Sequence, residues 1–244
     1  MSDYHSQTRS IPAERADMAV DAGLRAFMLG IYNKMGLGLA LSGALAWFVG
    51  TTPALYSVLL TAPVVYAVMF GPLAILLISS FAMRNPSPTS ANLIYWSVVT
   101  LIGVGMGAIV YTYARIPDGF TIVAKAFFVT AAAFGGLSLW GYTTKRDLSG
   151  FGTFLIMGLI GIIIASIVNM FIASSALSFA ISVIGVLVFA GLTAFDTQRL
   201  KHMYYQLGGD QRALAVGSTY GALSLYLNFI NLFQFILSIM SPRN

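Results

Sequence analysis

Long stretches without a charged side chain are the feature that most restricts how this sequence can fold. Five runs contain no Asp, Glu, Lys or Arg, namely residues 35–83, 85–114, 126–144, 148–195 and 213–242. Each reaches the roughly 18 apolar residues that indicate a membrane-spanning helix. Only 9% of all residues are charged, against about 25% in an average soluble domain. The chain is therefore predicted to be an all-α integral membrane protein.

The lengths of these runs predict seven spans. Residues 35–83 and 148–195 would each form a helix of about 70 Å, more than twice the hydrocarbon core of about 30 Å. Each run must therefore hold two spans, with breaks predicted at Gly50 to Pro53 and at Ala173 to Ser175. The predicted spans are residues 32–50, 54–80, 91–113, 121–142, 151–172, 176–199 and 213–240. Together they form one transmembrane domain, residues 32–244.

A polar segment, residues 1–31, precedes the first span and is predicted to be a cytosolic tail. Within it, residues 13–31 carry acidic side chains early and Arg25 late, as a helix lying on the membrane surface would. A solvated lead-in to the first span explains the same pattern equally well. The first apolar run begins too late for a cleaved signal peptide, so the first span is expected to be retained.

The distribution of Lys and Arg predicts the orientation, because basic residues near span ends stay on the cytosolic side. Ten of them fall on the N-terminal side of the predicted spans and three on the other side. The ten are Arg9, Arg15, Arg25, Lys34, Arg84, Lys145, Arg146, Arg199, Lys201 and Arg212, and the three are Arg115, Lys125 and Arg243. This count predicts a cytosolic N-terminus and an external C-terminus. It also explains the basic net charge without nucleic acid.

Glycines at helical spacing predict close packing between spans. Gly103 and Gly107 form a GxxxG pattern in the third span, and Gly158 and Gly161 share the fifth. Small residues let helix backbones approach one another, which matters in lipid because packing holds the helices together there. These glycines are therefore assigned to helix packing and to no chemistry.

Asp196 is the one acidic residue that falls within a predicted span. Of the eight acids, four lie in the tail and three in predicted loops, which leaves this one. A charge at the centre of a membrane helix costs at least about 2.5 kcal/mol, so an intramembrane carboxylate is a functional candidate by default. The alternative is structural: Asp196 lies near the cytosolic end of its span and pairs with Arg199, one turn further along the helix.

The last span carries polar residues along one face. They recur at steps of three and four, and they are Gly221, Ser224, Asn228, Asn231 and Gln234. Hydrogen bonding between helices is a sufficient explanation on spacing alone. The depth of Asn228 in its span is nevertheless compatible with contact to Asp196.

Several classes of function are not expected from this sequence. It has no cysteine and two histidines, and it lacks the GxSxG, GxxxxGK[ST] and HExxH patterns. Intramembrane aspartyl chemistry would need a second carboxylate beside Asp196. A dedicated calcium cage needs six to eight oxygens. We therefore expect no enzyme, no cofactor and no resident metal.

Several strings identify a family. The segments ISVIGVLVFAGLTAFDTQRLKHM and ALSLYLNFINLF in the last two spans, with RAFMLGIYNKMGLGLALSG and MGLIGIIIASIVN earlier, closely resemble the bacterial branch of the Bax inhibitor-1 (transmembrane Bax inhibitor motif) family. The resemblance covers essentially the whole chain. It implies a multi-pass protein of the bacterial inner membrane. It also implies a seven-helix bundle in which six helices surround the last one.

The resemblance also implies a mechanism, since some bacterial members act as pH-sensitive calcium leaks. There, an Asp in the sixth span shares a proton with an Asp in the seventh, and an Arg at the end of the second latches the former. Matching motifs place the first Asp at Asp196 in AFDTQ and the latch at Arg84 in FAMRN. The second Asp falls on Asn228, which cannot share a proton. A glutamate that leak-type members carry in the second span is also missing.

Two functions follow as expectations. The first is a pH-modulated cation leak, with calcium as the ion in transit, gated around Asp196 with Arg84, Asn228 and Asn231 as further candidates. The second is a non-transporting regulatory membrane protein that modulates stress survival or a membrane-bound protease. An aspartate at position 228 would have favoured the leak, and Asn228 shifts the balance toward the regulatory alternative.

Overall fold

The computed structural model describes the chain except for residues 1–12, 83–84 and 242–244. The described part contains eight α-helices and no strand. In chain order they are α1 (Ala13–Thr51), α2 (Pro53–Leu59), α3 (Val64–Ala82), α4 (Pro88–Tyr113), α5 (Gly119–Thr143), α6 (Ser149–Ile172), α7 (Ser175–Gln206) and α8 (Gln211–Met240). All except α2 are long and apolar enough to cross a membrane, which confirms the prediction of seven spans.

Both breaks predicted inside the long apolar runs are confirmed. The first run is interrupted where α1 ends at Thr51. In the second, Ala173 follows α6 in the left-handed conformation, with a φ of 53°. The next residue, Ser174, caps α7, because its hydroxyl accepts a hydrogen bond from the Leu177 N–H. The tight connection between α6 and α7 therefore comes from local backbone geometry.

The second span differs from its predicted bounds. It was placed at residues 54–80, but the structure divides this region into the short helix α2 and the spanning helix α3, which begins at Val64. The division lies at Pro63, which has no N–H to donate and disfavours helical geometry in the residue before it. The apolar composition of the connecting residues hid this break, because they look like part of a span.

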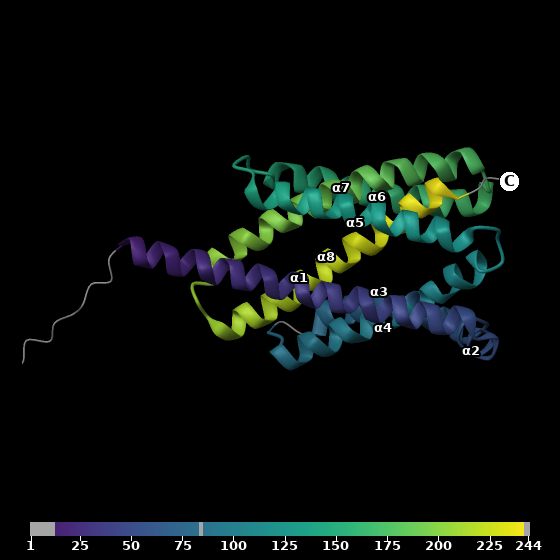
Figure 1. Ribbon diagram of the computed structural model, residues 1–244, viewed down its shortest axis with the longest axis horizontal. Coiled ribbons are helices and arrows are strands. Elements are labelled where there is room, and N and C mark those ends of the chain that lie inside the picture. The colour runs from purple at the N-terminus through teal and green to yellow at the C-terminus, as the bar shows by residue number, and fades with distance from the viewer. Residues whose placement is uncertain (1–12, 83–84, 242–244) are drawn as a thin grey trace, which may run out of the picture.

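The last helix lies at the centre of the bundle. Figure 1 shows α8 passing between α1 and the layer of α5 and α7. Within the described residues, α8 packs closely against α1, α4, α5 and α7, whereas α3 lies on α4 and α6 lies on α7. The central helix is therefore enclosed by four neighbours, and not by all six as the family resemblance implies. The outer positions of α3 and α6 leave much of their surfaces facing lipid.

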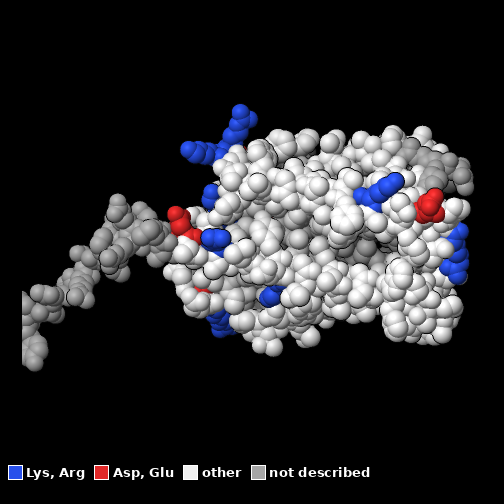
Figure 2. Space-filling model, in the orientation of Figure 1, with Lys and Arg blue, Asp and Glu red and all other residues white. Residues whose placement is uncertain are grey.

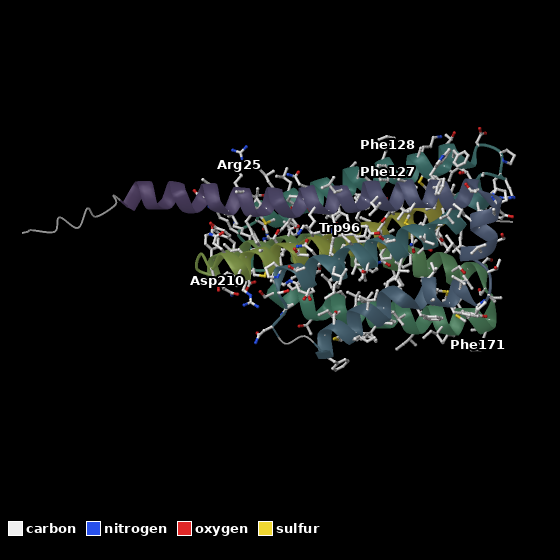
Figure 3. All side chains as sticks on the ribbon, turned by 90° about the horizontal axis from the view of Figure 1, so that it is seen from below. Arg25, Trp96, Phe127, Phe128, Phe171 and Asp210 are labelled. Carbon is white, nitrogen blue, oxygen red and sulfur yellow. The ribbon has the colours of Figure 1, made fainter. Side chains whose placement is uncertain are left out.

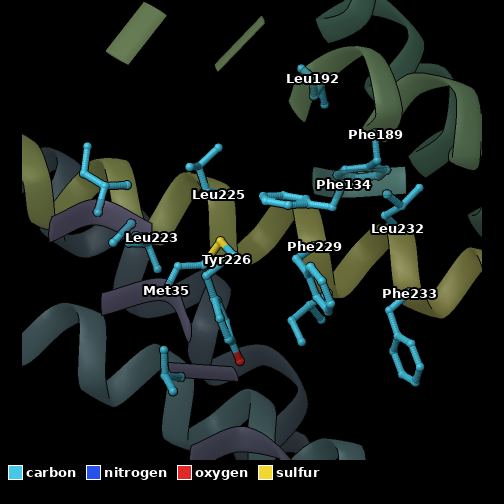
Figure 4. Close-up of a cluster of buried hydrophobic side chains, with 14 of the residues drawn as sticks. Met35, Phe134, Phe189, Leu192, Leu223, Leu225, Tyr226, Phe229, Leu232 and Phe233 are labelled. Atoms are coloured by element: carbon cyan, nitrogen blue, oxygen red, sulfur yellow. The ribbon is translucent and has the colours of Figure 1, made fainter. Parts of the chain in front are cut away.

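Aromatic side chains fill the space between α8 and the helices around it. Phe229 of α8 packs edge-on against Phe134 of α5, with ring centroids 5.5 Å apart (Figure 4). Tyr226, fully buried one turn earlier on α8, points toward α1, where its hydroxyl lies 2.6 Å from that of Ser42. These contacts hold α8 in one rotational setting, which decides which of its residues face α7.

The glycines assigned to helix packing lie in two kinds of surroundings. At Gly103, a Cβ atom would lie 2.7 Å from the Ser42 Cα, and at Gly107 it would lie 2.8 Å from the side chain of Val49. The GxxxG pattern of α4 thus lies in close contact with α1, where a side chain larger than hydrogen has no room. Gly158 meets Val188 of α7 in the same way, at 2.9 Å. Gly161 faces open space, so it makes no such contact.

The two ends of the bundle differ in charge. Most of the described Lys and Arg residues lie at the end where α1 and α8 begin, which we call the basic end (Figure 2). Its members include Arg25, Lys145, Arg146, Lys201 and Arg212. Arg115 and Lys125, in and after the α4–α5 connection, belong to the opposite end.

Candidate functional site

The site lies between α7 and α8, and a short connection joins the end of α7 to the start of α8. Asp210 caps α8 by accepting hydrogen bonds from the backbone N–H groups of Arg212 and Ala213, at 2.9 and 3.1 Å. Helix α7 continues to Gln206, beyond the predicted end of its span at residue 199. The extra two turns place Asp196 ten residues before the end of α7, so it does not lie at a helix end.

Asp196 is buried between α7 and α8, and both of its oxygens are engaged. Its Oδ2 accepts hydrogen bonds from the Ser224 hydroxyl at 2.6 Å and from the Asn228 amide at 2.8 Å. Ser224 and Asn228 are one turn apart on α8, so they present their donors to the same carboxylate oxygen. Asp196 and Asn228 are each only 5% exposed. The predicted contact between these two residues is present.

Arg199 provides the only positive charge paired with Asp196 among the described residues. Its Nη2 lies 2.9 Å from Oδ1, and the same nitrogen lies 3.5 Å from the Ser224 hydroxyl. The ion pair proposed as the structural alternative is therefore present. However, its two members differ in environment, because the Arg199 side chain is 55% exposed whereas that of Asp196 is 7% exposed. The Arg199 guanidinium can therefore move into solvent, whereas the Asp196 carboxylate stays buried.

The other predicted site residues lie apart from this carboxylate or outside the described residues. The Asn231 amide donates to the Leu227 carbonyl of its own helix, at 2.8 Å. Arg84 is among the residues that the structure does not describe, so its latch with Asp196 stays a prediction. Of the polar face of α8, Ser224 and Asn228 thus form the site, while Asn231 lies one turn further along.

Two cavities lie at opposite ends of the same face of α8. One, of about 500 Å³ near the basic end, is lined by Arg199, His202 and Tyr220 together with Gly217 and Gly221. The other, of about 790 Å³ near the opposite end, is lined by α3, α4 and α8, and its α8 residues include Gln234, Ser238 and Ser241. Ser224, Asn228 and Asn231 lie between these two groups at steps of three and four. We call this continuous face, from Gly217 to Ser241, the polar seam.

Comparison with known proteins assigns the chain to a family. The family model described as "Inhibitor of apoptosis-promoting Bax1" matches residues 24–244. This chain belongs to the Bax inhibitor-1 family. It is 55% identical to an uncharacterized protein of Caulobacter vibrioides over an alignment of 248 positions, gaps included. This alignment covers 98% of this chain and 97% of that protein. It is 42% identical to the inner membrane protein YbhL of Escherichia coli K12 over 235 residues, which cover 94% and 97%.

The inner-membrane location of YbhL and the seven apolar helices identify this Bax inhibitor-1 family member as a multi-pass inner-membrane protein. The names of these two relatives state no activity. The site must therefore be interpreted from its own chemistry.

Sequence reasoning missed Gln198, which braces the site in this family member. Its side chain donates to the Arg146 carbonyl and accepts from the Leu148 N–H, both at 2.8 Å. These bonds fasten the connection between α5 and α6 to α7, two residues after Asp196. No sequence signal separates this glutamine from an ordinary surface residue, because the loop it binds is distant in sequence.

A second polar cluster, also missed, lies on the other side of α8. The Lys34 ammonium of α1 donates to the side chains of Asn92 on α4 and Thr219 on α8, at 2.8 and 2.7 Å. The Lys34 carbonyl accepts from the Tyr95 hydroxyl, at 2.7 Å. Lys34 had been counted only as an orientation signal. Its position just inside the first predicted span was the signal that could have found it.

Proposed function

We propose that this Bax inhibitor-1 family member is a passive, non-enzymatic cation leak of the inner membrane, with calcium as the ion to test first. Asp196 is the group that would meet the ion. It is the one buried carboxylate among the described residues, and a buried charge on a membrane helix is costly to keep. We attribute this cost to a charged species that the carboxylate attracts.

The polar seam supports a route for that ion. It runs along α8 from one cavity to the other, and Asp196 faces it between them. A cation that leaves water needs oxygen ligands to replace part of its hydration shell. Hydroxyl and amide oxygens of the seam, with the Asp196 carboxylate, offer such ligands. The described residues bring no three His, Cys, Asp or Glu side chains together, which suits transit better than tight binding.

Arg199 supports a closed resting state. Its guanidinium occupies Oδ1 of Asp196 at 2.9 Å and also lines the cavity near the basic end. An incoming cation would therefore compete with Arg199 for the same carboxylate. The exposed side chain can swing into this cavity, which would leave Asp196 open to the ion. Modulation by pH would then need a group other than a proton-sharing carboxylate pair, because Asn228 has no proton to share.

The test is calcium flux into proteoliposomes, measured between about pH 5 and pH 8 with the wild type and Asp196→Asn. Asparagine retains an oxygen that can accept from Ser224 and Asn228, so the variant should fold while losing the charge. We expect flux well above that of protein-free vesicles for the wild type. For the variant, we expect a loss of tenfold or more, since about 1.4 kcal/mol of ion stabilisation already gives that factor. Equal flux for both proteins would refute the role of Asp196.

The regulatory alternative has one observation in its favour. Asn228 stands where a second carboxylate would make a proton-sharing pair, and it satisfies Asp196 with a simple hydrogen bond. In that case the Asp196 cluster would fix the relative position of α7 and α8, and the protein would act on stress survival or a membrane-bound protease. Flux indistinguishable from protein-free vesicles for folded wild-type protein would favour this alternative.

The proposed orientation has the basic end in the cytosol, because ten of the thirteen Lys and Arg residues fall on that side of the predicted spans. The chain has no native cysteine, so single cysteines can be introduced at Ser149, near the basic end, and at Ser241, near the opposite end. A membrane-impermeant thiol reagent applied from outside should label position 241 and spare position 149. The reverse pattern would contradict the orientation.

A further inference from the structure

A groove between α1 and α5 is the largest cavity not used by the proposed ion route. Near the basic end it encloses about 830 Å³ between the two helices, with Phe229 of α8 among its lining residues. A second cavity, of about 490 Å³, continues it toward the opposite end and shares Phe229. Both cavities lie between α1 and α5, and we call them together the α1–α5 groove.

Glycines keep this groove deep. Gly135 lines the larger cavity and Gly43 the smaller one, and a Cβ atom built at either position would meet nothing within 4 Å. They therefore differ from Gly103 and Gly107, which are pressed against α1. The space beside them is lined mainly by apolar side chains such as Met28 and Met35. A cavity of this size lined by apolar groups attracts hydrocarbon in preference to water.

The lining of the groove is more polar at the basic end than along the rest of its length. Its polar lining residues, among them Arg25, Ser138 and Tyr142, come from the beginning of α1 and the end of α5, which lie at the basic end. Figure 3 shows Arg25 projecting from α1 near this end. Lys201 of α7 adds a second cation, because its ammonium donates to the Tyr142 carbonyl at 3.0 Å. Asp21 offsets one of the two charges, and it forms no ion pair with Arg25.

The opposite end of the groove limits the width of its occupant. There the rings of Trp47 on α1 and Phe120 on α5 meet, with centroids 5.2 Å apart, and both residues line the smaller cavity. A transmembrane helix about 10 Å across could not lie along the whole groove beneath these rings, whereas a hydrocarbon chain could. Basic pockets between helices on the cytosolic side of membrane proteins bind anionic lipid head groups.

We propose that the α1–α5 groove binds one anionic phospholipid, with an acyl chain between the helices and the phosphate at Arg25 and Tyr142. The positive charge at the basic end of the groove would attract the lipid phosphate. The apolar side chains along the rest of the groove would contact the acyl chain. This site is independent of the proposed ion route, because Asp196 and the polar seam line neither cavity.

The test uses phosphatidylglycerol with a photoreactive diazirine on its acyl chain, incorporated into proteoliposomes of the full-length protein. Cross-linked peptides should concentrate in residues 28–35 of α1 and 131–139 of α5. Gly135→Leu fills the groove and should reduce this labelling several-fold. Gly136→Leu is the matched control, because the neighbouring glycine also has open space around it but does not line the groove. Equal effects of the two variants would overturn the proposal.

The head group is tested by charge. Arg25→Gln should weaken phosphatidylglycerol labelling by roughly fivefold, as expected for one basic residue near a lipid phosphate, while Arg212→Gln at the same end should leave it unchanged. Unlabelled phosphatidylglycerol should compete better than phosphatidylcholine. Equal competition, or labelling spread evenly over the lipid-facing helices, would contradict an anionic lipid as its occupant.

Discussion

Replacing Asn228 with aspartate is expected to make the stability of the bundle strongly dependent on pH. The Asn228 amide lies 2.8 Å from Asp196 Oδ2, so the variant would place two carboxylates within hydrogen-bond distance in a buried site. Such a pair holds together by sharing one proton and repels once both groups are ionised. The folded variant would therefore bind more protons than its unfolded chain. By linkage, its stability falls as pH rises, by up to about 1.4 kcal/mol per pH unit per proton.

The measurement is the thermal unfolding midpoint in detergent between about pH 5 and pH 8. Wild type and Asn228→Asp should diverge progressively toward the alkaline end. Asn231→Asp is the matched control, because Asn231 lies one turn along the same helix and bonds its own backbone at Leu227. Parallel profiles for wild type and Asn228→Asp would show that positions 196 and 228 do not meet in the membrane.

Gly141→Ala is expected to destabilise the bundle by about 2 to 3 kcal/mol, the upper part of the usual range for overpacking. A Cβ atom at position 141 of α5 would lie 2.9 Å from the Ala194 Cα and collide with its carbonyl oxygen on α7. Both atoms belong to backbone, so no side chain can move aside. The helices must separate, and the displacement occurs two residues from Asp196.

The matched control is Gly136→Ala, in the same helix, where a Cβ atom meets nothing within 4 Å. Alanine favours helix over glycine by about 1 kcal/mol, so this control should be neutral or slightly stabilising. Unfolding of both variants in detergent, followed by tryptophan fluorescence, compares them directly. If Gly141→Ala unfolds together with Gly136→Ala, the close approach of α5 and α7 is not part of the native bundle.

The number of spans could be predicted because it depends only on the lengths of uncharged runs and on the thickness of the membrane. The break at Thr51 was visible for the same reason, since Pro53 follows it within a long apolar run. The start of α3 at Val64 was not, because residues 60–63, which connect α2 to α3, carry no charge and so belong to the same uncharged run. The arrangement of the helices could not be predicted either, because no sequence pattern in α3 or α6 indicates that these two helices lie at the periphery of the bundle.

The site could be predicted in part. Asp196 stood out as the one acid within a span. Helical spacing placed Asn228 on the polar face of α8, and the family resemblance placed it opposite Asp196. Sequence reasoning left the choice between a functional carboxylate and a local ion pair with Arg199, and the structure contains this ion pair beside the hydrogen bond from Asn228. Contacts between residues far apart in the sequence, such as Lys34 with Thr219, were missed because hydrogen bonds between helices depend on how each helix is rotated.

The account depends most on Arg199 as the cation that an incoming ion must displace. The most direct measurement is calcium flux into proteoliposomes for Arg199→Gln beside the wild type, with Asp196→Asn added to the same background. We expect Arg199→Gln to increase flux several-fold, because Asp196 loses the partner that occupies its Oδ1. The double variant should fall to the level of Asp196→Asn alone, since Arg199 would act only through that carboxylate. A folded Arg199→Gln protein with lowered or unchanged flux would contradict the account.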